Sequence, residues 1–450
     1  MEVIARETIK PSSPTPSHLE IYPLSFIDHL CPPNYIPLIF FYQNQSIQPD
    51  INGETSTIFK LCKERTKMLK ESLSQILSMY YPFAGRVKDQ VSIECNDEGV
   101  IFIVTHMKQK LSEILKDPSE EFLNPLFPDE MHWKKPATGS HGSFLAVQVN
   151  HFECGGTAIS VCLSHKVAEA SSLCHFVKDW ASITTKSSQV TLPHFNGASL
   201  FPMADLPIFP ETEAEKSKPN MVSKRFLLDA TNTKSLMNIA ITQGVENPTR
   251  EHVVGALIYK SAVSSLRSKF SKGQNQLTTY LNVALDLRAG LIPPQPEKSV
   301  GNLVWGFAVP SPNSAEEEEE ELHELVRKTQ KGLSEFWDTY ENGFGKEHMM
   351  KILEVLKGKG ASSENNNEVV VFNVTSWCGI GMYEADFGWG KPVWVTTCGC
   401  PPKKDVALLM DAKDGEGIEV LVSMEEQDMA LLEANVELLQ YASINPGVVA

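Results

Sequence analysis

The sequence has no long apolar run. None of its stretches approaches the ~20 apolar residues that a membrane-spanning helix needs. The opening, MEVIARETIKPSSPTPSHLE, has charges and prolines where a secretory signal peptide needs an apolar stretch. The nine cysteines are an odd number without regular spacing, so no disulfide framework is indicated. We therefore expect a reduced, cytoplasmic protein that does not bind a membrane.

Several catalytic and cofactor motifs are also missing. There is no G-x-S-x-G nucleophile elbow, no P-loop, no Rossmann glycine fingerprint and no H-E-x-x-H zinc helix. These absences argue against a serine hydrolase, a P-loop nucleotide enzyme, a dinucleotide enzyme and a zinc protease. The stretch CGC at Cys398 and Cys400 has no matching Cys/His pair nearby, whereas a zinc site needs about four ligands. We predict buried or half-buried thiols there and no metal.

Excess positive charge is lacking too. The chain carries 56 acidic against 40 basic residues, a net charge of −16. This balance argues against generic binding to nucleic acid or to an anionic membrane. A length of 450 residues, 42% of them hydrophobic, exceeds what one domain usually holds, so we expect two domains. We expect the protein to be a monomer.

Apolar periodicity predicts helices and strands in both halves of the chain. Residues 55–81 have apolar residues at spacings of three and four, typical of an amphipathic helix. Two stretches, 91–106 and 143–164, each show two apolar strands around a turn and predict hairpins. A helix is expected after the second hairpin. Residues 191–222 are rich in Pro, Ser, Asn and charge and predict a crossover linker. The fold class is therefore α/β or α+β.

His165 lies in the stretch LSHKVAEASS, where the second predicted hairpin ends. A side chain at such a junction of elements can face a cleft. A histidine can act there as a general base, because its ordinary pKa of ~6.5 is close to cellular pH. The alternative is an ordinary residue at the end of an apolar run. His165 alone does not decide between the two.

A set of motifs along the whole chain bears on this choice. In order they are YYPFAGR (80–86), SHKVAEA (164–170), LNVALDLR (281–288), VGNLVW (300–305), TSW (375–377) and DFGWGKP (386–392). With them, the chain resembles the plant BAHD acyl-CoA-dependent acyltransferases. The sequence of its first thirty residues is most similar to those of the alkaloid-acetylating branch of that family. DFGWG at this distance after the histidine is the most specific of these motifs.

The resemblance implies a fold and a reaction. The fold is α/β, with two domains of similar size, each resembling the chloramphenicol acetyltransferase subunit, and a tunnel between them. Residues 1–190 form the first domain, 191–222 the crossover linker and 223–450 the second domain, while about 392–412 returns to the first. Acyl-CoA enters the tunnel from one face as co-substrate, and a small-molecule alcohol or amine acceptor enters from the other. No cofactor is bound.

The resemblance also implies roles for site residues. His165 removes the acceptor's proton during attack on the thioester, and no acyl-enzyme forms. A thioester is already activated, so the reaction requires neither metal nor covalent nucleophile. The oxyanion needs a donor, for which Trp377 or a hydroxyl of Thr375 or Ser376 is the candidate. The alternative is that TSW is a strand packed in the core.

One position departs from the family's H-x-x-x-D-G pattern. Glu169 stands where the family has Asp, and Ala170 where it usually has Gly. That Asp supports the site by pairing with an arginine, here Arg288 of LDLR. Three outcomes are open: Glu169 keeps the pair and the enzyme is active, the loop is re-aimed toward an unusual reaction, or the fold persists as a binding-only protein. Ala170 is strained only if its φ is positive.

The remaining motif residues are expected to support the site. Asp386 anchors a turn in which Gly388 and Gly390 allow tight backbone. Asn302 lines the tunnel or holds its geometry, or else is a turn residue after Gly301. By resemblance the donor is acetyl-CoA and the acceptor an alkaloid or similar bulky alcohol. A malonyl donor and an amine acceptor stay open.

Overall fold

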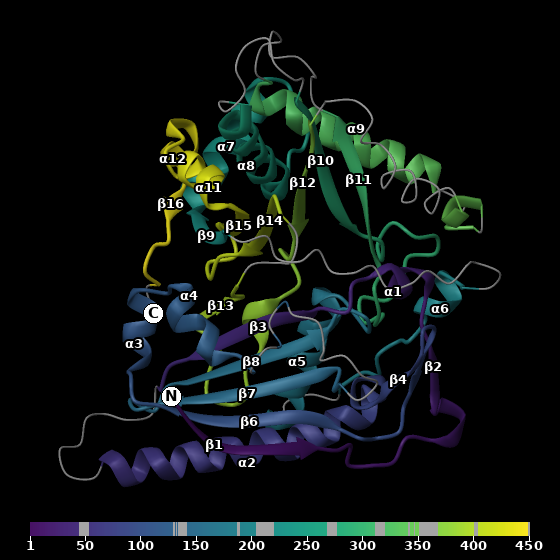
Figure 1. Cartoon of the computed structure of the whole chain (residues 1–450), viewed down its shortest axis with the longest axis vertical. Coiled ribbons are helices and arrows are strands. Elements are labelled where there is room, and N and C mark those ends of the chain that lie inside the picture. Colours follow the sequence, from purple (N-terminus) through teal and green to yellow (C-terminus); the bar gives the residue numbers. More distant parts are fainter. Residues whose placement is uncertain are drawn as a thin grey trace.

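The computed structural model of the chain is shown in Figure 1. It describes residues 1–44, 54–128, 131, 133, 142–186, 190–203, 220–267, 277–310, 320–340, 343–345, 347–350, 368–399 and 404–448. Half of the predicted crossover, residues 204–219, and Cys400 lie outside the described residues. Two large sheets organise the molecule, one built mainly from the N-terminal half of the chain and the other from the C-terminal half.

The first sheet has six strands in the order β1-β6-β7-β8-β3-β13. In that order they span Glu2–Ile9, Val100–Met107, Leu145–Phe152, Thr157–Ser164, Tyr35–Tyr42 and Trp394–Thr396. Every residue of β3, β7 and β8 is buried. Both faces of the sheet's centre are therefore covered, which explains the near-continuous apolar runs in these strands.

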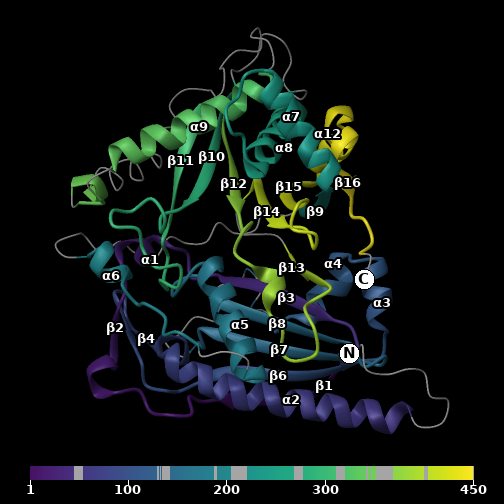
Figure 2. The ribbon, with the colours of Figure 1, turned by 180° about the vertical axis from the view of Figure 1, so that it is seen from behind.

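Two long helices, α2 (Glu54–Met79) and α5 (Ala170–Thr185), cover one face of this sheet and pack on each other (Figures 1 and 2). Their apolar side chains form one core with β3, β6, β7 and β8. The opposite face packs against α3 (Leu111–Lys116) and α4 (Glu120–Leu123). A small sheet of β2 (Ile21–Pro23), β5 (Ser92–Glu94) and β4 (Arg86–Asp89) lies beside it, and α1 (Phe26–Leu30) and α6 (Gly197–Leu200) are short.

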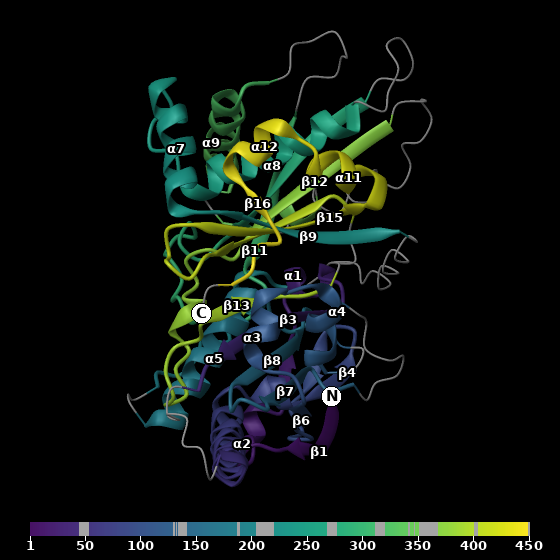
Figure 3. The ribbon, with the colours of Figure 1, turned by 90° about the vertical axis from the view of Figure 1, so that its left-hand side faces the viewer.

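The second sheet has seven strands in the order β11-β10-β12-β14-β15-β9-β16. In that order they span Val304–Pro310, Leu277–Asp286, Glu368–Ser376, Val406–Asp411, Ile418–Glu425, Met221–Leu228 and Ser443–Ile444. Its helices are α7 (Ala230–Thr242), α8 (Arg250–Arg267), α9 (Leu322–Thr339), α11 (Glu426–Glu433) and α12 (Val436–Tyr441). Figure 3 shows this sheet between its helices and the N-terminal half. Leu408, Met410 and Leu421 of its inner face join the core of the first half.

A segment from the C-terminal half crosses back to the first sheet. β13 pairs with β3, and Trp377, Met382 and Phe387 belong to the first core. β14, at 406–411, lies in the second sheet instead. The returning segment thus begins and ends earlier than the expected stretch 392–412. The domain boundaries at 190 and 222 stay a prediction.

The DFGWG motif anchors this segment. Asp386 Oδ1 accepts hydrogen bonds from the backbone N–H groups of Gly388 (2.8 Å) and Gly390 (3.0 Å). Both glycines have positive φ, +101° and +100°, which side chains with a Cβ rarely adopt. Phe387 packs edge-on against Trp180 of α5, with ring centroids 4.9 Å apart. The motif therefore fixes a turn against the first core and does not line the cavity described below.

Most of the sequence-based elements agree with the structure. The predicted helix at 55–81 is α2, and the predicted hairpin at 143–164 is the antiparallel pair β7–β8. The predicted hairpin at 91–106 is wrong. Its first strand, β5, pairs with β2 and β4, whereas its second, β6, pairs with β1 and β7. None of the described helices is both long and apolar enough to cross a membrane.

Candidate active site

His165 is the first residue after β8 and lies between that strand and α5. Its backbone N–H donates to Asn34 O at 2.7 Å, which ties the end of β8 to the residue just before β3. The imidazole Nδ1 is buried and has no hydrogen-bond partner among the described residues. Burial lowers the pKa of His165 from its ordinary value, against an opposing effect of Glu169. The ring is therefore neutral near pH 7 and has a nitrogen able to accept a proton.

Asn302 fixes the backbone of this histidine from behind. Its Nδ2 donates to His165 O (2.7 Å) and to Asp28 Oδ1 (2.8 Å), and its backbone N–H donates to the same Asp28 oxygen (3.0 Å). Asn302 is fully buried and is not among the cavity-lining residues. Its assignment to substrate binding stays a prediction, while in the structure its amide N–H groups hold the loop. The alternative that it holds the site's geometry agrees with the structure.

Glu169 and Arg288 form the predicted ion pair across the two halves. Glu169 Oε1 lies 2.7 Å from Arg288 Nη2, and both residues are buried. The same oxygen accepts from Ser172 N (3.1 Å) and Ser172 Oγ (2.8 Å), while Oε2 accepts from Leu303 N (2.9 Å). Glu169 is thus the N-cap of α5 as well as the partner of Arg288. Its carboxylate is fully engaged in holding the loop.

Arg288 makes further hydrogen bonds. Nη2 donates to Ser299 O at 2.7 Å, and Nη1 donates to Asp286 Oδ1 at 3.0 Å. The guanidinium group therefore connects the end of β10, the loop before β11 and the start of α5. Planar, multiply bonded arginine is suited to such a joint.

The Glu169 and Ala170 departures from the family pattern cause no local distortion. The Glu169 carboxylate contacts both Arg288 and the backbone N–H of Leu303. Ala170 is the first residue of α5 and is not among the residues with positive φ. Replacing Gly by Ala at the start of a helix therefore carries no strain here.

A cavity of about 350 Å³ lies between the two sheets, and we call it the inter-sheet cavity. His165 lines it from the first half, and Thr375, Ser376 and Trp377 line it from the end of β12. The structure thus brings the predicted base and the predicted oxyanion donors to one cavity. Its other lining residues are Ile36, Trp133, Glu169, Ala170, Ser171, Asn282, Ala284, Leu285, Asp286, Arg288, Leu303, Val304, Asn373, Val374, Cys378, Ile380, Val406 and Leu408.

The TSW residues differ in how their polar groups are used. Ser376 Oγ accepts from Cys378 N at 3.1 Å. For Thr375 Oγ1 and Trp377 Nε1, the described part of the chain supplies no hydrogen-bond partner. Trp377 stacks on Trp133, with ring centroids 6.3 Å apart, and Trp133 is held by its own Nε1–H to Cys398 O at 2.7 Å. Trp377 is therefore fixed in place with its N–H available.

The second sheet forks beside this cavity. The parallel pairing of β10 with β12 ends at Val283 and Val374. Beyond that point β10 stays paired with β11 as far as Asp286, and β12 stays paired with β14 as far as Ser376. The two strands separate, and an opening between them follows.

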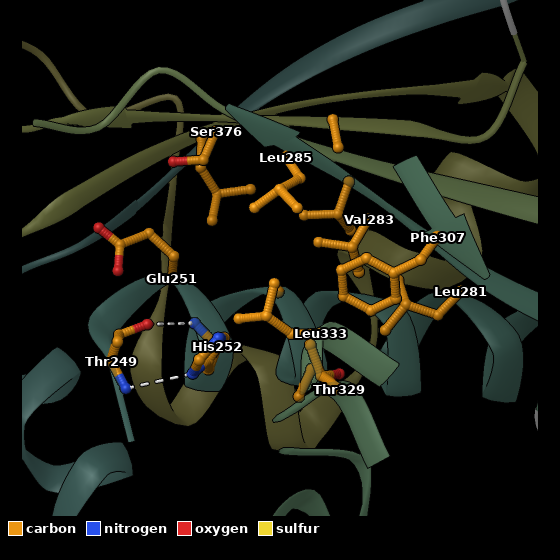
Figure 4. A pocket seen from close by; sticks show the side chains of 15 residues that line it. Thr249, Glu251, His252, Leu281, Val283, Leu285, Phe307, Thr329, Leu333 and Ser376 are labelled. Carbon is orange, nitrogen blue, oxygen red and sulfur yellow. Dashed lines mark hydrogen bonds between the residues drawn. The ribbon is translucent and has the colours of Figure 1, made fainter. Parts of the chain in front are cut away.

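A second cavity, of about 220 Å³, lies on the helix side of the fork. Figure 4 shows Thr249 and His252 on one side of it and Val283, Leu285 and Ser376 of the sheet on the other. We call it the helix-side cavity. It shares four lining residues with the inter-sheet cavity, namely Ala284, Leu285, Val374 and Ser376. The two cavities therefore meet at the fork.

Sequence reasoning missed several residues of the site. Asp28, which holds Asn302, is fully buried, and burial raises its pKa. It also closes a capping box with Ser25 at the start of α1, so its S-x-x-D spacing was a usable signal. Trp133 and Asn282 had no such signal, because only tertiary structure brings them to the cavity. Among the described residues, no group of three or more His, Cys, Asp or Glu side chains is placed to hold a metal.

Comparison with known proteins agrees with this geometry. The sequence profile of the Transferase family matches residues 1–439. Epi-neemfruitin B 7-O-acetyltransferase of Melia azedarach is 34% identical over 459 residues, which cover 99% of each chain. Akuammiline synthase 2 of Alstonia scholaris is 32% identical, over 99% of this chain and 97% of that protein.

Solved structures agree as well. The crystal structure of vinorine synthase is similar with a TM-score of 0.80 and 31% identity over 98% of both chains. TRI101 of F. sporotrichioides, crystallised with coenzyme A and T-2, has a TM-score of 0.70 at 16% identity, covering 94% of this chain and 99% of that one, and shows the shared fold. The mixed α/β fold and these relatives define an acyl-CoA-dependent acyltransferase. The chain belongs to the Transferase family, the BAHD acyltransferases.

The Glu169–Arg288 pair predicts a graded mutant series. Glu169→Ala leaves Arg288 buried and unpaired, so we expect a loss of about 3 kcal/mol in the free energy of unfolding and a large loss of activity. Glu169→Asp keeps the charge and the helix cap and should keep most activity. Denaturant unfolding and initial rates measure both effects.

Asp286 provides the matched control. It contacts the same guanidinium, but its side chain is 52% exposed, so Asp286→Ala should cost less than about 1 kcal/mol. An alanine variant at 169 that unfolds like the wild type would contradict the supporting role of Glu169.

Proposed function

We propose that this enzyme transfers an acetyl group from acetyl-CoA to a hydroxyl of a plant specialised metabolite, with His165 as general base. The observation that supports this most directly is His165, which burial keeps neutral by lowering its pKa and which lines the same cavity as Thr375 and Trp377. An alcohol is a poor nucleophile at neutral pH, and a positioned base contributes about 10²–10⁴-fold to the rate.

The reaction proceeds in two steps. The acceptor hydroxyl attacks the thioester carbonyl while its proton passes to the His165 ring, and a tetrahedral oxyanion forms. The C–S bond then breaks, CoA leaves as the thiol after taking the proton, and the ester is released. No acyl-enzyme forms, because the acceptor oxygen itself attacks. Holding both substrates in one cavity supplies the remaining rate enhancement through proximity.

The oxyanion is stabilised by the end of β12. Trp377 Nε1–H and the Thr375 hydroxyl face a cavity from which much water is excluded, where a fixed donor contributes more than in bulk solvent. Trp377 is held by stacking on Trp133, so its donor is pre-organised. Ser376 is the weaker candidate, because its oxygen already accepts from Cys378 N–H.

Acyl-CoA reaches His165 through the fork of the second sheet. The helix-side cavity and the inter-sheet cavity share the residues at the parting of β10 and β12, which supports a path for a narrow pantetheine arm. The acceptor occupies the inter-sheet cavity. The two substrates then approach the base from opposite sides of the sheet.

The acceptor is a bulky polycyclic alcohol. The names of the relatives identify acetyltransferases of limonoids and an akuammiline synthase, which supports an acetyl donor and an acceptor of alkaloid or limonoid type. Malonyl-CoA as donor and an amine as acceptor are the alternatives to be included in a screen. We also propose that the enzyme works as a monomer in the cytoplasm.

Replacing the base tests the proposed reaction. His165→Ala should lower kcat/KM by about 10²–10⁴-fold, because the acceptor proton then has no base. The measurement is thiol release from acetyl-CoA or malonyl-CoA with a panel of alkaloid and terpenoid alcohols. Melting temperature provides the control for folding. Equal rates for variant and wild type would rule out His165 as the base.

The pH dependence reports the state of His165. The ring must be neutral to accept a proton, and burial lowers its pKa, so kcat/KM should be flat near pH 7. Activity should fall only on the acid side, with a midpoint below the ordinary histidine value of about 6.5. A midpoint above that value in the rate profile would contradict a buried, neutral base.

The oxyanion assignment predicts a kcat effect without a KM effect. Trp377→Phe keeps an aromatic ring but removes the N–H, so kcat should fall by about 10²-fold with the acceptor KM unchanged. Trp133→Phe is the matched control, because its N–H bonds Cys398 O and not substrate. Similar kcat values for Trp377→Phe and the wild type would transfer the role to Thr375.

A further inference from the structure

The second sheet contributes a pair of asparagines to the lining of the inter-sheet cavity, and neither takes part in the proposed acyl transfer. Asn282 of β10 and Asn373 of β12 are direct partners in the parallel register, and both line the cavity. Their neighbours Leu281 and Phe372 point the other way, into the core under the helices. The pair is the last cavity-facing rung before the strands separate.

Hydrogen bonds fix how each amide is oriented. Asn373 Nδ2 donates to Val371 O (3.1 Å) and to Asp405 O (3.4 Å). Its Oδ1 must then face Asn282, and it accepts from Asn282 Nδ2 at 3.1 Å. The donor and acceptor ends of both side chains are thereby defined.

Asn282 keeps hydrogen-bonding capacity after this contact. An amide has two N–H donors and an acceptor oxygen, and only one N–H is used. The described residues offer no partner for the second N–H or for Oδ1. A Cβ at Gly306, on the neighbouring β11, would lie 3.3 Å from Asn282 Oδ1. Because residue 306 is glycine, no side chain covers the amide from that strand.

We propose that Asn282 determines acceptor specificity by hydrogen bonding to a second oxygen function of the acceptor, oriented by Asn373. This inference rests on the proposed function. A pocket with apolar walls gains orientation and specificity from a few fixed polar groups. Asn282 presents one donor and one acceptor side by side, which matches a hydroxyl. An acetyl methyl has no group to match it, and the acceptor occupies this cavity, so we assign the amide to the acceptor; a contact with the amides of the pantetheine arm would instead appear in the KM for acetyl-CoA.

The role of Asn282 predicts discrimination between acceptors that differ by one hydroxyl. A site built to bind a hydroxyl disfavours the analogue that lacks it, since its own polar groups then remain unpaired. We expect the wild type to prefer the diol over the mono-alcohol by about tenfold in kcat/KM, equivalent to one hydrogen bond. Asn282→Ala should abolish this preference through KM, with kcat and the KM for acetyl-CoA unchanged.

The experiment uses the full-length enzyme, acetyl-CoA and matched pairs of terpenoid and alkaloid alcohols that differ by one hydroxyl. Asn282→Leu is the second variant, because it fills the same volume without a hydrogen bond. Tyr280→Phe is the matched control: Tyr280 lies on the same face of β10 but outside the cavity lining. It should keep the wild-type preference.

The outcomes separate this inference from the proposed function. Loss of the preference in both Asn282 variants supports it. Retention of the preference, or a rise in the KM for acetyl-CoA instead, overturns it and leaves the acyl transfer intact. A wild type that releases no CoA with any acceptor overturns the proposed function, and the role of Asn282 falls with it.

Discussion

The buried ion pair between Glu169 and Arg288 is the constraint on which the site depends. Each residue follows a strand from a different sheet, β8 for the glutamate and β10 for the arginine. Neither charge is tolerable alone in a buried position, so the pair forces the two strand ends together. The same carboxylate caps α5, and the same guanidinium holds Ser299 O. This ion pair therefore helps to hold the two halves together beside the cavity.

The fork in the second sheet keeps each strand that borders the opening paired on one side. An opening in a sheet usually leaves N–H and C=O groups unpaired, which is costly when they are buried. Here β10 stays paired with β11 as far as Asp286, and β12 stays paired with β14 as far as Ser376. Each strand bordering the gap is thus paired on its outer side. The outer pairs therefore hold both strand ends in place beside the gap.

Local signals in the sequence predicted the local parts of this structure. The β7–β8 hairpin, α2 and α5 follow from apolar periodicity and turn residues within a few positions. Glu169 and Arg288 are 119 residues apart, so no local signal links them. Their pairing was expected from the family resemblance instead. The hairpin at 91–106 failed because two adjacent apolar strands look alike whether they pair with each other or with distant strands. Periodicity carries no information on partner choice.

The site residues that sequence reasoning missed are missed for the same reason. Asn302 was expected to bind substrate, yet it is enclosed by Asp28 and the backbone of His165, a contact across 274 residues for the aspartate. Asn282 gave no signal, because an asparagine in a strand looks like a surface residue until β12 is placed beside it. Only the register of β10 with β12 shows that this amide faces a cavity.

The division of polar groups in the cavity separates fixed from reactive parts. Glu169 and Arg288 bond each other and neighbouring groups, and the Asn302 amide N–H groups bond Asp28 and His165 O, so these residues set the geometry of the site. His165 is held through its backbone by Asn302, and Trp377 is held by stacking on Trp133. Pre-organised groups that keep free capacity are the ones that can act on a ligand, since no internal bond must break first. The departure from the family pattern at 169 falls among the fixed parts, where Glu169 supplies the negative charge that pairs with Arg288.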